Sequence, residues 1–271
     1  KAREVLEGDQ THDESLWRSV VEMGWTATTI PEEFDGLGLG YLELCVIAEE
    51  LGRSLAPTPF SSSVYLATEA LINQGSKEQH QKYLPKLAAG EIVGTLAHTE
   101  TTNSPSPENL NCELSNNKLN GIKIAVTDGD VANFAVVSAK EGDKVVLGLV
   151  DLASKGVEIT SQNTLDPSRS HASIKFKDAD AEILGSSQDG WVALQEILDH
   201  AAVLFAFEQL GGAEACMDMA KEYAMGRFAF GRPIASFQAI KHKIADMYIA
   251  VELARSNCYF GAWALSTNAP E

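Results

Sequence analysis

Positive charge is scarce in this sequence of 271 residues. Lys and Arg together number 21 against 38 Asp and Glu, which gives a formal net charge of −17 at pH 7. Nucleic acids and anionic membranes are bound mainly through clustered Lys and Arg, so this balance argues against both as the main partner. A polyanionic ligand stays compatible with the sequence if local cations or helix N-termini face its phosphates.

Cysteine is also sparse, and long apolar runs are missing. The four cysteines lie far apart without a C-x-x-C pair, so we expect reduced thiols in the core and no disulfide or metal site. The histidines lack the i, i+4 spacing of metalloproteases. No apolar run reaches 18 residues and no leader follows Lys1, so we expect no membrane span and no signal peptide, and a cytoplasmic protein.

Periodicity divides the chain into three predicted domains. Residues 1–91 have helical spacing of apolar residues, and Ser76 with Gln79 forms a capping box. Residues 92–189 hold short apolar runs bounded by turn residues, which predicts a compact antiparallel β-domain. Within it, residues 111–126 read as a hairpin that turns at 115–118.

Residues 190–271 return to helical spacing. The first stretch, 191–228, contains Gly211-Gly212, a pair that usually marks close helix packing or a bend. The next helix, from about Ser236, carries an apolar heptad seam typical of a bundle. The seam consists of Ile240, Ile244, Met247, Val251, Ala254 and Cys258. The sequence therefore predicts an α+β chain: an N-terminal helical domain, a central antiparallel β-domain and an incomplete C-terminal helical bundle.

This order of domains resembles the acyl-CoA dehydrogenase family, and several motifs make the resemblance specific. They are Tyr83-Leu-Pro-Lys-Leu-Ala-Ala-Gly-Glu91, Thr99-Glu100 after a strand, Leu119-Asn-Gly-Ile-Lys123 with Val126-Thr-Asp-Gly129, Tyr223-Ala-Met-Gly-Arg227, Phe230-Gly-Arg-Pro-Ile234 with Phe237-Gln238, and Lys241-His-Lys-Ile-Ala-Asp-Met247. The resemblance covers nearly the whole chain, and the order and spacing of the motifs carry it.

The resemblance implies an FAD enzyme that removes a proton from Cα and a hydride from Cβ of an acyl-CoA. Backbone N–H groups and a Thr hydroxyl then hydrogen-bond the flavin ring. By resemblance, Thr99 and Thr127 take these places, and the backbone of His98 lies beside the pyrimidine ring. The alternative for Thr127 is a plain turn residue before Asp128-Gly129.

The resemblance also implies that Arg227 reaches the pyrophosphate of an FAD held by a neighbouring subunit. A guanidinium binds phosphate bidentately, and Phe230 and Gln238 would lie beside it. This arrangement requires at least a dimer, either homo- or hetero-oligomeric. The alternatives are that Arg227 stabilises a helix C-terminus and that Phe230 belongs to the core.

Two places in the expected flavin site depart from the family pattern. Pro105, which has neither an N–H nor a hydroxyl, falls where the family has a pyrophosphate-binding Ser. Ser104 or Ser106 is the candidate replacement, and Ser104 is also the candidate for a contact with the substrate. Ala125 stands where an aromatic residue usually shields the flavin, so the pocket beside the ring is expected to be wider or the FAD less tightly held.

A catalytic base cannot be assigned. One of its two family positions lies beyond Glu271, and the other falls in the run Asp199-His200-Ala201-Ala202, where Ala cannot abstract a proton. His200, with Glu208 nearby, is an alternative base. A role on the helix face is favoured for it, because no orienting partner is visible in the sequence.

Three functions remain open at this point. The first is an FAD-dependent acyl-CoA dehydrogenase or a subunit of one, with an acyl-CoA substrate of unknown chain. The second is a catalytically inactive partner subunit, as in the heteromeric enzymes that act on steroid side chains. The third is a flavin monooxygenase or nitroalkane oxidase on the same scaffold, because a fold does not fix a function.

Overall fold

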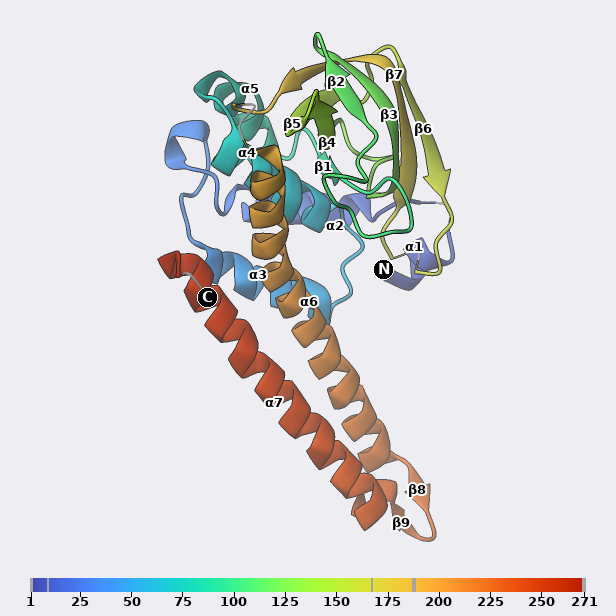
Figure 1. Cartoon of the computed structure of the whole chain (residues 1–271). Helices are drawn as coiled ribbons and strands as arrows, with labels where there is room; N and C mark the ends of the chain where they lie inside the picture. Colours follow the sequence, from blue (N-terminus) through green and yellow to red (C-terminus); the bar gives the residue numbers. More distant parts are fainter. Residues whose placement is uncertain (1, 9, 167, 187–188, 270–271) are drawn as a thin grey trace. The chain divides into compact units, whose positions relative to one another are not determined.

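The computed structural model describes residues 2–8, 10–166, 168–186 and 189–269 (Figure 1). The chain forms two compact units. The first contains Lys1–Leu39 and Pro57–Ala201, and the second contains Gly40–Ala56 and Ala202–Glu271. Helices precede and follow a central group of strands along the chain, so the predicted α+β class is confirmed. The three-domain division of the chain remains a prediction.

The helices of the first unit begin where local capping chemistry allows. Asp13 accepts a hydrogen bond from the backbone N–H of Leu16 at 2.8 Å, and Ser76 and Gln79 form the predicted capping box. These helices are α1 (Ala2–Leu6), α2 (Glu14–Glu22), short 3-10 turns at Trp25–Ala27 and Glu32–Phe34, a π-helix at Ser61–Thr68, α4 (Glu69–Gln74), α5 (Lys77–Ala88) and the start of α6 (Gly190–Gly226).

Seven strands form one sheet in the first unit. They are β1 (Gly94–Ala97), β2 (Glu113–Ser115), β3 (Lys118–Thr127), β4 (Phe134–Glu141), β5 (Lys144–Asp151), β6 (Val157–Gln162) and β7 (His171–Ile183). The order of six of them is β1-β4-β2-β3-β7-β5, and the seventh, β6, pairs with β7 beside this path. Because β4 also pairs with β5, the strands from β4 to β5 close into a barrel. Its interior is filled by aliphatic side chains such as Leu119, Val137, Val146 and Ile174.

The hairpin predicted at residues 111–126 is present. Strands β2 and β3 pair antiparallel, with Ser115 opposite Lys118. The two turn residues, Asn116 and Asn117, have φ of 52° and 58°. Positive φ at both central positions is the requirement of a type I′ turn, which Asn tolerates better than most residues.

Most strand pairs are antiparallel, as expected, but two are parallel. β1 runs parallel to β4, and β2 touches β4 in parallel through Glu113 and Lys140. Parallel neighbours need a long connection to bring the chain back to the same end of the sheet. Here the loop after β1 and the β2–β3 hairpin provide that connection, and turn signals in the sequence do not reveal such a crossover.

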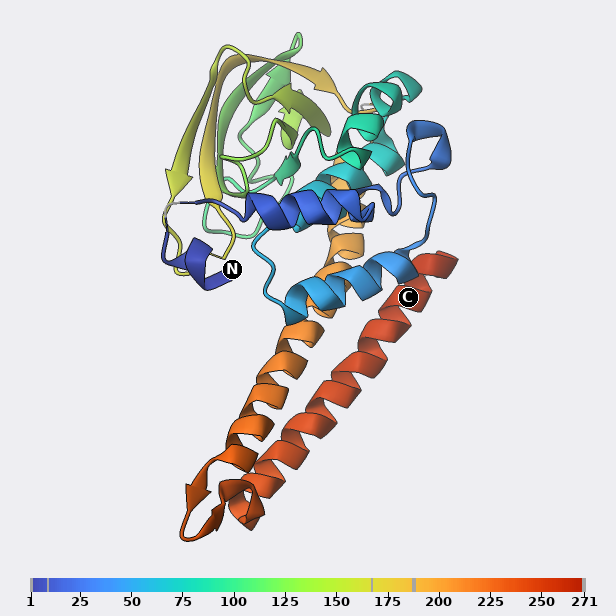
Figure 2. The same cartoon turned by 180° about the vertical axis from the view of Figure 1, so that it is seen from behind.

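The second unit is helical. It contains α3 (Tyr41–Arg53), the remainder of α6, and α7 (Gln238–Thr267). Helices α6 and α7 run antiparallel and are joined at their tip by β8 (Phe228–Ala229), β9 (Arg232–Pro233) and a 3-10 turn at Ile234–Ser236 (Figure 2).

Glycine allows α3 and α6 to cross closely, as the Gly211-Gly212 pair predicted. A Cβ atom at Gly211 would lie 1.9 Å from the carbonyl oxygen of Glu49, and one at Gly52 would lie 2.0 Å from that of Glu208. No side chain fits at such distances, so glycine is required at both positions.

Ion pairs tie the three helices of this unit together. Arg53 on α3 contacts Glu214 and Asp218 on α6 at 3.0 and 2.9 Å, and Arg255 on α7 contacts Glu49 on α3 and Glu214 on α6 at 2.5 and 3.2 Å. Glu214 thus joins both arginines, which makes a network and not a set of isolated surface pairs.

The predicted seam of α7 is only partly covered by the rest of the unit. Val251 is buried and Cys258 is half-buried, whereas Met247 and Ala254 are exposed. Many further apolar side chains on α6, α7 and their tip are also exposed: Met219, Tyr223, Met225, Phe228, Phe230, Tyr248, Ile249, Leu253, Tyr259, Phe260 and Trp263. So many exposed apolar side chains on one helical pair are typical of an interaction site.

Among the described residues, α6 alone is long and apolar enough to cross a membrane by length and composition. The core helix of a soluble protein passes the same test. Here Phe207 of α6 makes an edge-to-face contact with Tyr259 of α7, with ring centroids 5.4 Å apart, and Gly211 packs against α3. These contacts match a core helix of the protein's own fold.

Candidate functional site

The end of β1 and the second half of β3 bring two predicted site residues, Thr99 and Thr127, into one region. The backbone N–H of Ile124 donates to the carbonyl oxygen of Thr99 at 2.9 Å. Further along the same pair of segments, the hydroxyl of Thr95 donates to the carbonyl oxygen of Thr127 at 2.6 Å. Thr99 and Thr127 therefore lie along one seam, which we call the β1–β3 seam.

Thr127 is the last residue of β3, and the turn begins after it. Its hydroxyl oxygen lies 3.5 Å from Nε2 of His171, the residue paired with it across to β7. The side chain is half-buried, so it is held in place but still reachable. His171 was not among the predicted site residues, and only the β3–β7 register reveals it.

Ala125 lies in a bulge of β3. Its φ is 51°, and the pairing with β7 shifts between Lys123 and Val126. Its N–H donates to Oε1 of Gln162, at the end of β6, at 3.0 Å. Gln162 is therefore a second neighbour of the β1–β3 seam that the sequence did not indicate. Ala125 is exposed, and the wider pocket expected beside it remains a prediction.

A buried ion pair lies beside this seam. Nζ of Lys123 is 2.8 Å from Oε1 of Glu100 and donates to the hydroxyl of Ser138 at 3.0 Å. The side chain of Lys123 is 0% exposed and that of Glu100 is 8% exposed. Burial lowers the pKa of Lys123. For Glu100, burial acts to raise the pKa, but the hydrogen bonds from Lys123 and two backbone N–H groups outweigh it, so the pKa lies below its usual value.

His98 follows β1 directly and lies near this ion pair. Burial, and then the positive charge of Lys123, lower the pKa of its imidazole. Its Nδ1 atom is buried and has no hydrogen-bond partner among the described residues. A buried polar atom without a partner is uncommon and calls for an explanation, such as a bound group.

The loop after Glu100 carries Ser104, Pro105 and Ser106. Ser104 and Pro105 are exposed, and the cavity that the loop encloses measures only about 10 Å³. A volume of this size holds at most one water molecule, so the loop as it stands has no enclosed space for a pyrophosphate. The roles predicted for Ser104 and Ser106 remain predictions.

Asp128, next to Thr127, has a buried carboxyl group. Ser62 on the π-helix donates to it at 2.6 Å and Ser170 at 3.3 Å. Burial raises the pKa of Asp128 to about 6, despite the opposing effect of these two donors. The π-helix itself is buried along its whole length although it contains several hydroxyl groups, and π-helical turns occur frequently at functional sites.

His200 has an orienting partner, and the expectation that it lacks one is wrong. Its Nδ1 lies 2.6 Å from Oε1 of Glu69 on α4, a side chain only 3% exposed. This hydrogen bond raises the pKa of His200, whereas partial burial acts in the opposite direction. The partner is 131 residues away in the sequence and could not be found there. Ala201, the next residue, is buried.

The other three predicted site residues belong to the second unit. Arg227 follows α6 and is exposed, and among the described residues it makes no ion pair. Phe230 is 96% exposed with φ of 53°, so the alternative that it belongs to the core is wrong. Gln238 begins α7 and is also exposed. All three thus lie at the open tip of the helical pair.

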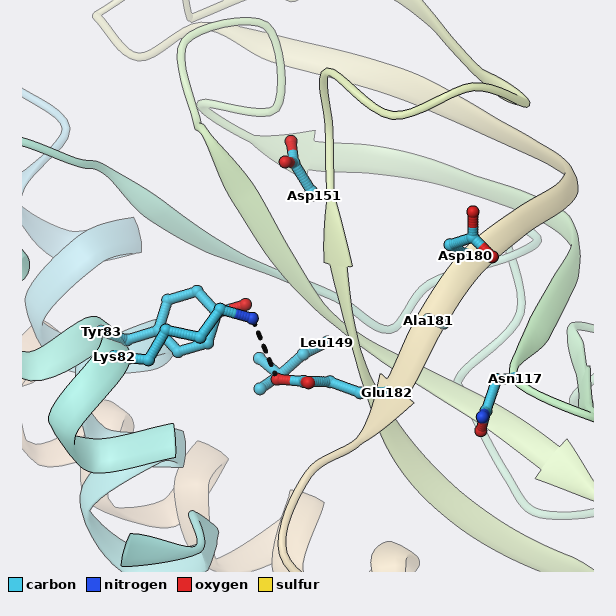
Figure 3. Close-up of a pocket in the computed structure, with 8 residues that line it drawn as sticks. All are labelled: Lys82, Tyr83, Asn117, Leu149, Asp151, Asp180, Ala181 and Glu182. Carbon is cyan, nitrogen blue, oxygen red and sulfur yellow. Dashed lines mark ion pairs between the residues drawn. The ribbon is translucent and has the colours of Figure 1, made fainter. Parts of the chain in front are cut away.

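The wider hollows of the first unit contain none of the predicted site residues. One of them measures about 280 Å³ and lies between α5 and strands β5 and β7 (Figure 3), where Lys82 pairs with Glu182 at 3.6 Å. A neighbouring cavity of about 550 Å³ shares Lys82, Tyr83 and Asp151 with it. Their walls mix cationic and anionic side chains, which gives them no clear preference for one charge.

Known proteins resemble this chain along most of its length. Residues 1–91 match the acyl-CoA dehydrogenase, N-terminal domain, and residues 188–271 match the acyl-CoA dehydrogenase, C-terminal domain. The mitochondrial isovaleryl-CoA dehydrogenase of Solanum tuberosum is 32% identical over 91% of this chain, which spans 64% of that protein. The acyl-CoA dehydrogenase IpdE2 of Mycobacterium tuberculosis is 31% identical over 94% of the chain and 67% of its own length.

Solved structures also resemble this chain. A chain from the work on the electron transferring flavoprotein of Acidaminococcus fermentans superimposes with a TM-score of 0.92 at 29% identity, over 99% of this chain and 76% of its own. A chain of the ChsE4-ChsE5 complex from Mycobacterium tuberculosis gives 0.87 at 28% identity, over 98% and 72%. The sequence, the fold and both terminal domains point the same way, and the chain belongs to the acyl-CoA dehydrogenase family.

Proposed function

We propose that this protein is an FAD-dependent acyl-CoA dehydrogenase or a subunit of one, which introduces a double bond between Cα and Cβ of an acyl-CoA thioester. The chain spans less than two thirds of the plant isovaleryl-CoA dehydrogenases that it matches, so the activity of the whole protein is inferred. A bound flavin would accept the hydride from Cβ, and a base would take the proton from Cα.

The observation that carries the proposal is the β1–β3 seam. It places Thr99 beside Ile124, and Thr127 beside Thr95 and His171, in one region of the first unit. The buried Nδ1 of His98, which directly follows β1, has no partner among the described residues and adds a polar atom that can bind a ligand. These residues fit the polar edge of a flavin ring, where hydrogen bonds stabilise the electron-rich reduced form.

Arg227, Phe230 and Gln238 would contact the dinucleotide part of an FAD held by another subunit. Their exposure at the tip of the α6–α7 pair supports this role, because they stand free to reach another chain. The apolar surface on the same two helices supports a homo- or hetero-oligomer. Ser104 is proposed to replace the missing donor at Pro105 and to approach the substrate.

Ala201 favours a second candidate, a partner subunit without a catalytic base. Its methyl group cannot take the proton from Cα, and the ChsE4-ChsE5 complex shows that a related chain occurs in a two-component assembly. The His200–Glu69 pair is the alternative acceptor in this part of α6, because a carboxylate that orients an imidazole also raises its basicity. In either case we propose a cytoplasmic location, in keeping with the acidic composition and the bacterial acyl-CoA dehydrogenases among the relatives.

Flavin titration tests the proposal directly. The purified protein, alone and with any polypeptide that copurifies with it, should show flavin absorbance and bind added FAD. Thr127→Val and Arg227→Gln should each raise the FAD dissociation constant about tenfold, equivalent to about 1.4 kcal/mol. Thr160→Val on exposed β6 and Arg18→Gln on α2 are matched controls that should leave it unchanged.

The substrate is tested by anaerobic addition of acyl-CoA thioesters of different chain lengths. A catalytic subunit should lose its flavin absorbance band as hydride is transferred. A partner subunit should bind the thioester without bleaching and should bleach only with a second polypeptide. Protein that binds no FAD in any assembly, or binds it equally well in both variants, would contradict the proposal.

A further inference from the structure

We infer that the buried Glu100–Lys123 pair is a positioning element for the backbone at His98 and Thr99, and that it sets how tightly and in what environment FAD is held. The inference rests on the proposed function. Its physical basis is that the pair fixes both ends of the loop after β1 to the barrel wall, immediately beside the residues proposed to meet the flavin.

The carboxylate of Glu100 closes the loop. Oε1 accepts the N–H of Cys112 at 3.0 Å, and Oε2 accepts the N–H and the side-chain amide of Asn111 at 2.6 and 3.2 Å. Residues 101–110 thus begin and end at the same side chain. The exposed, Ser- and Pro-rich loop is anchored at its base, although few contacts hold its middle.

The ammonium group of Lys123 fixes the same point to two strands. Lys123 belongs to β3. Its Nζ donates to the hydroxyl of Ser138 on β4 and to the carboxylate of Glu100. The carbonyl oxygen of Lys123 also accepts the hydroxyl of Ser173 on β7 at 3.2 Å. Strands β3, β4 and β7 therefore all hold Lys123, and through it Glu100, in one place.

Thr99 and His98 are covalently next to this anchor. Thr99 adjoins Glu100, and its carbonyl oxygen accepts the N–H of Ile124, the neighbour of Lys123. A shift of the anchor would move both sides of that hydrogen bond. His98, whose Nδ1 is buried without a partner, precedes Thr99 and would move with it.

Stability alone does not account for a charged pair at this position. Two apolar residues of similar size often stabilise a core as well as a buried ion pair does, because the pair must first be stripped of water. What directional, fully hydrogen-bonded groups add is a defined backbone position. Such definition is needed where a ligand must be met within a fraction of an ångström.

The double variant Glu100→Gln with Lys123→Met tests the inference, because it removes both charges and leaves none unpaired. We expect the FAD dissociation constant to rise at least tenfold, and the visible absorption bands of the remaining bound flavin to shift. The matched control is Lys118→Met with Asp180→Asn, an exposed pair on β3 and β7. It should leave affinity and spectrum unchanged.

Two further measurements separate positioning from simple stability. Far-ultraviolet circular dichroism and thermal unfolding report whether each variant folds. Ser138→Ala, which removes one acceptor from Lys123 and no charge, should still fold and should weaken FAD binding about threefold in the same direction. The double variant is judged if it folds, and Ser138→Ala is judged if the double variant does not fold. If the variant that is judged changes neither the FAD affinity nor the flavin spectrum, the pair is only structural and the inference is wrong. If the unmodified protein binds no FAD in any assembly, the proposed function itself has failed.

Discussion

The two units of this chain differ in which side chains they bury and which they expose. In the first, charged and hydroxyl groups are buried and paired, as in Glu100 with Lys123 and Asp128 with Ser62. In the second, side chains as apolar as Leu253 and Trp263 are exposed, and ion pairs such as Arg53 with Glu214 lie at the surface. The first unit therefore buries and pairs charged groups such as these, although Nδ1 of His98 has no hydrogen-bond partner among the described residues, whereas the second leaves many apolar side chains uncovered.

This difference assigns different roles to the two halves of the proposed flavin site. Residues on the β1–β3 seam are fixed by hydrogen bonds within the first unit, so their geometry exists before any ligand arrives. Arg227 and Phe230 at the tip of the second unit are exposed. We expect the first half to depend on internal packing and the second half to depend on assembly.

The largest expected effect comes from breaking the internal pairing of the first unit. Lys123→Met leaves the carboxylate of Glu100 in a site that is 8% exposed, without its cation. The free energy of unfolding should fall by about 3–5 kcal/mol, the usual consequence of an uncompensated buried charge. Urea unfolding measures it. Adding Glu100→Gln should recover much of the loss.

The exposed pair on the same strand provides the control for Lys123→Met. Lys118→Met removes the partner of Asp180, where both side chains are at least 45% exposed, and should cost less than about 1 kcal/mol. An equal loss in the two single variants would mean that the burial of Lys123 has no energetic consequence.

Asp128 tests the same unit through pH. Burial holds the pKa of its carboxyl group at about 6, against an ordinary 3.8, so between about pH 4 and pH 6 the folded protein keeps a proton that the unfolded chain releases. The contribution of this group to the free energy of unfolding is fully present below about pH 4. It is lost as the pH rises through the folded pKa of about 6. The loss should amount to about 3 kcal/mol.

Asp128→Asn should remove this part of the pH dependence, which unfolding curves at pH 4, 5, 6 and 7 would measure. Ser62→Ala removes a donor that lowers the pKa of Asp128, so the loss of stability should move to higher pH. The assignment fails if the Asn variant has the same slope as the unmodified protein over this range.

Local sequence signals predicted much of this fold. The capping box at Ser76 and the turn at Asn116-Asn117 involve neighbours within three residues, and both are present. Gly211 likewise indicated close packing correctly, whereas Gly212 makes only an ordinary contact. Such features depend on backbone chemistry that any short peptide expresses, so they can be read without knowing the rest of the chain.

The candidate site could be predicted only in part, because its contacts cross long stretches of sequence. Residue polarity alone would turn Ile122 toward the core and Lys123 toward solvent, but Ile122 is 48% exposed and Lys123 is fully buried. Strand alternation from the buried Leu119 puts Lys123 on the inward face, and the bulge near Ala125 then turns Val126 to that face as well. Glu69 as the partner of His200 similarly depends on a packing of α4 against α6 that no local pattern encodes.

Replacing each of two adjacent glycines of the second unit with alanine should change the stability of the protein in opposite directions. Gly211→Ala places a methyl group 1.9 Å from the carbonyl oxygen of Glu49, which forces α3 and α6 apart and should lower the free energy of unfolding by about 1–3 kcal/mol. At Gly212 the nearest atom is 3.6 Å away, an ordinary contact. Gly212→Ala should therefore stabilise the protein by up to about 1 kcal/mol, because Ala favours a helix.

Chemical unfolding followed by circular dichroism distinguishes these two variants, since α6 and α7 dominate the helical signal. Each variant is the control for the other, because they differ only in position. If both lowered stability equally, glycine itself and not the close crossing would be the requirement, and the packing of α3 on α6 described here would be wrong.

The smallest change in the free energy of unfolding is expected for a substitution of Phe230, at the tip of the second unit. Phe230 has φ of 53°, a region that costs a bulky residue energy and costs glycine none, and its ring is 96% exposed. Phe230→Gly should therefore change the free energy of unfolding by less than about 1 kcal/mol, with relief of backbone strain offset by greater freedom of the unfolded chain. The same variant should bind FAD several-fold more weakly, because it removes a ring that we propose contacts an FAD held by another subunit. Unfolding and flavin titration on one preparation compare the two effects. A large loss of stability with unchanged FAD affinity would place Phe230 in the structure of the tip and remove it from the proposed site.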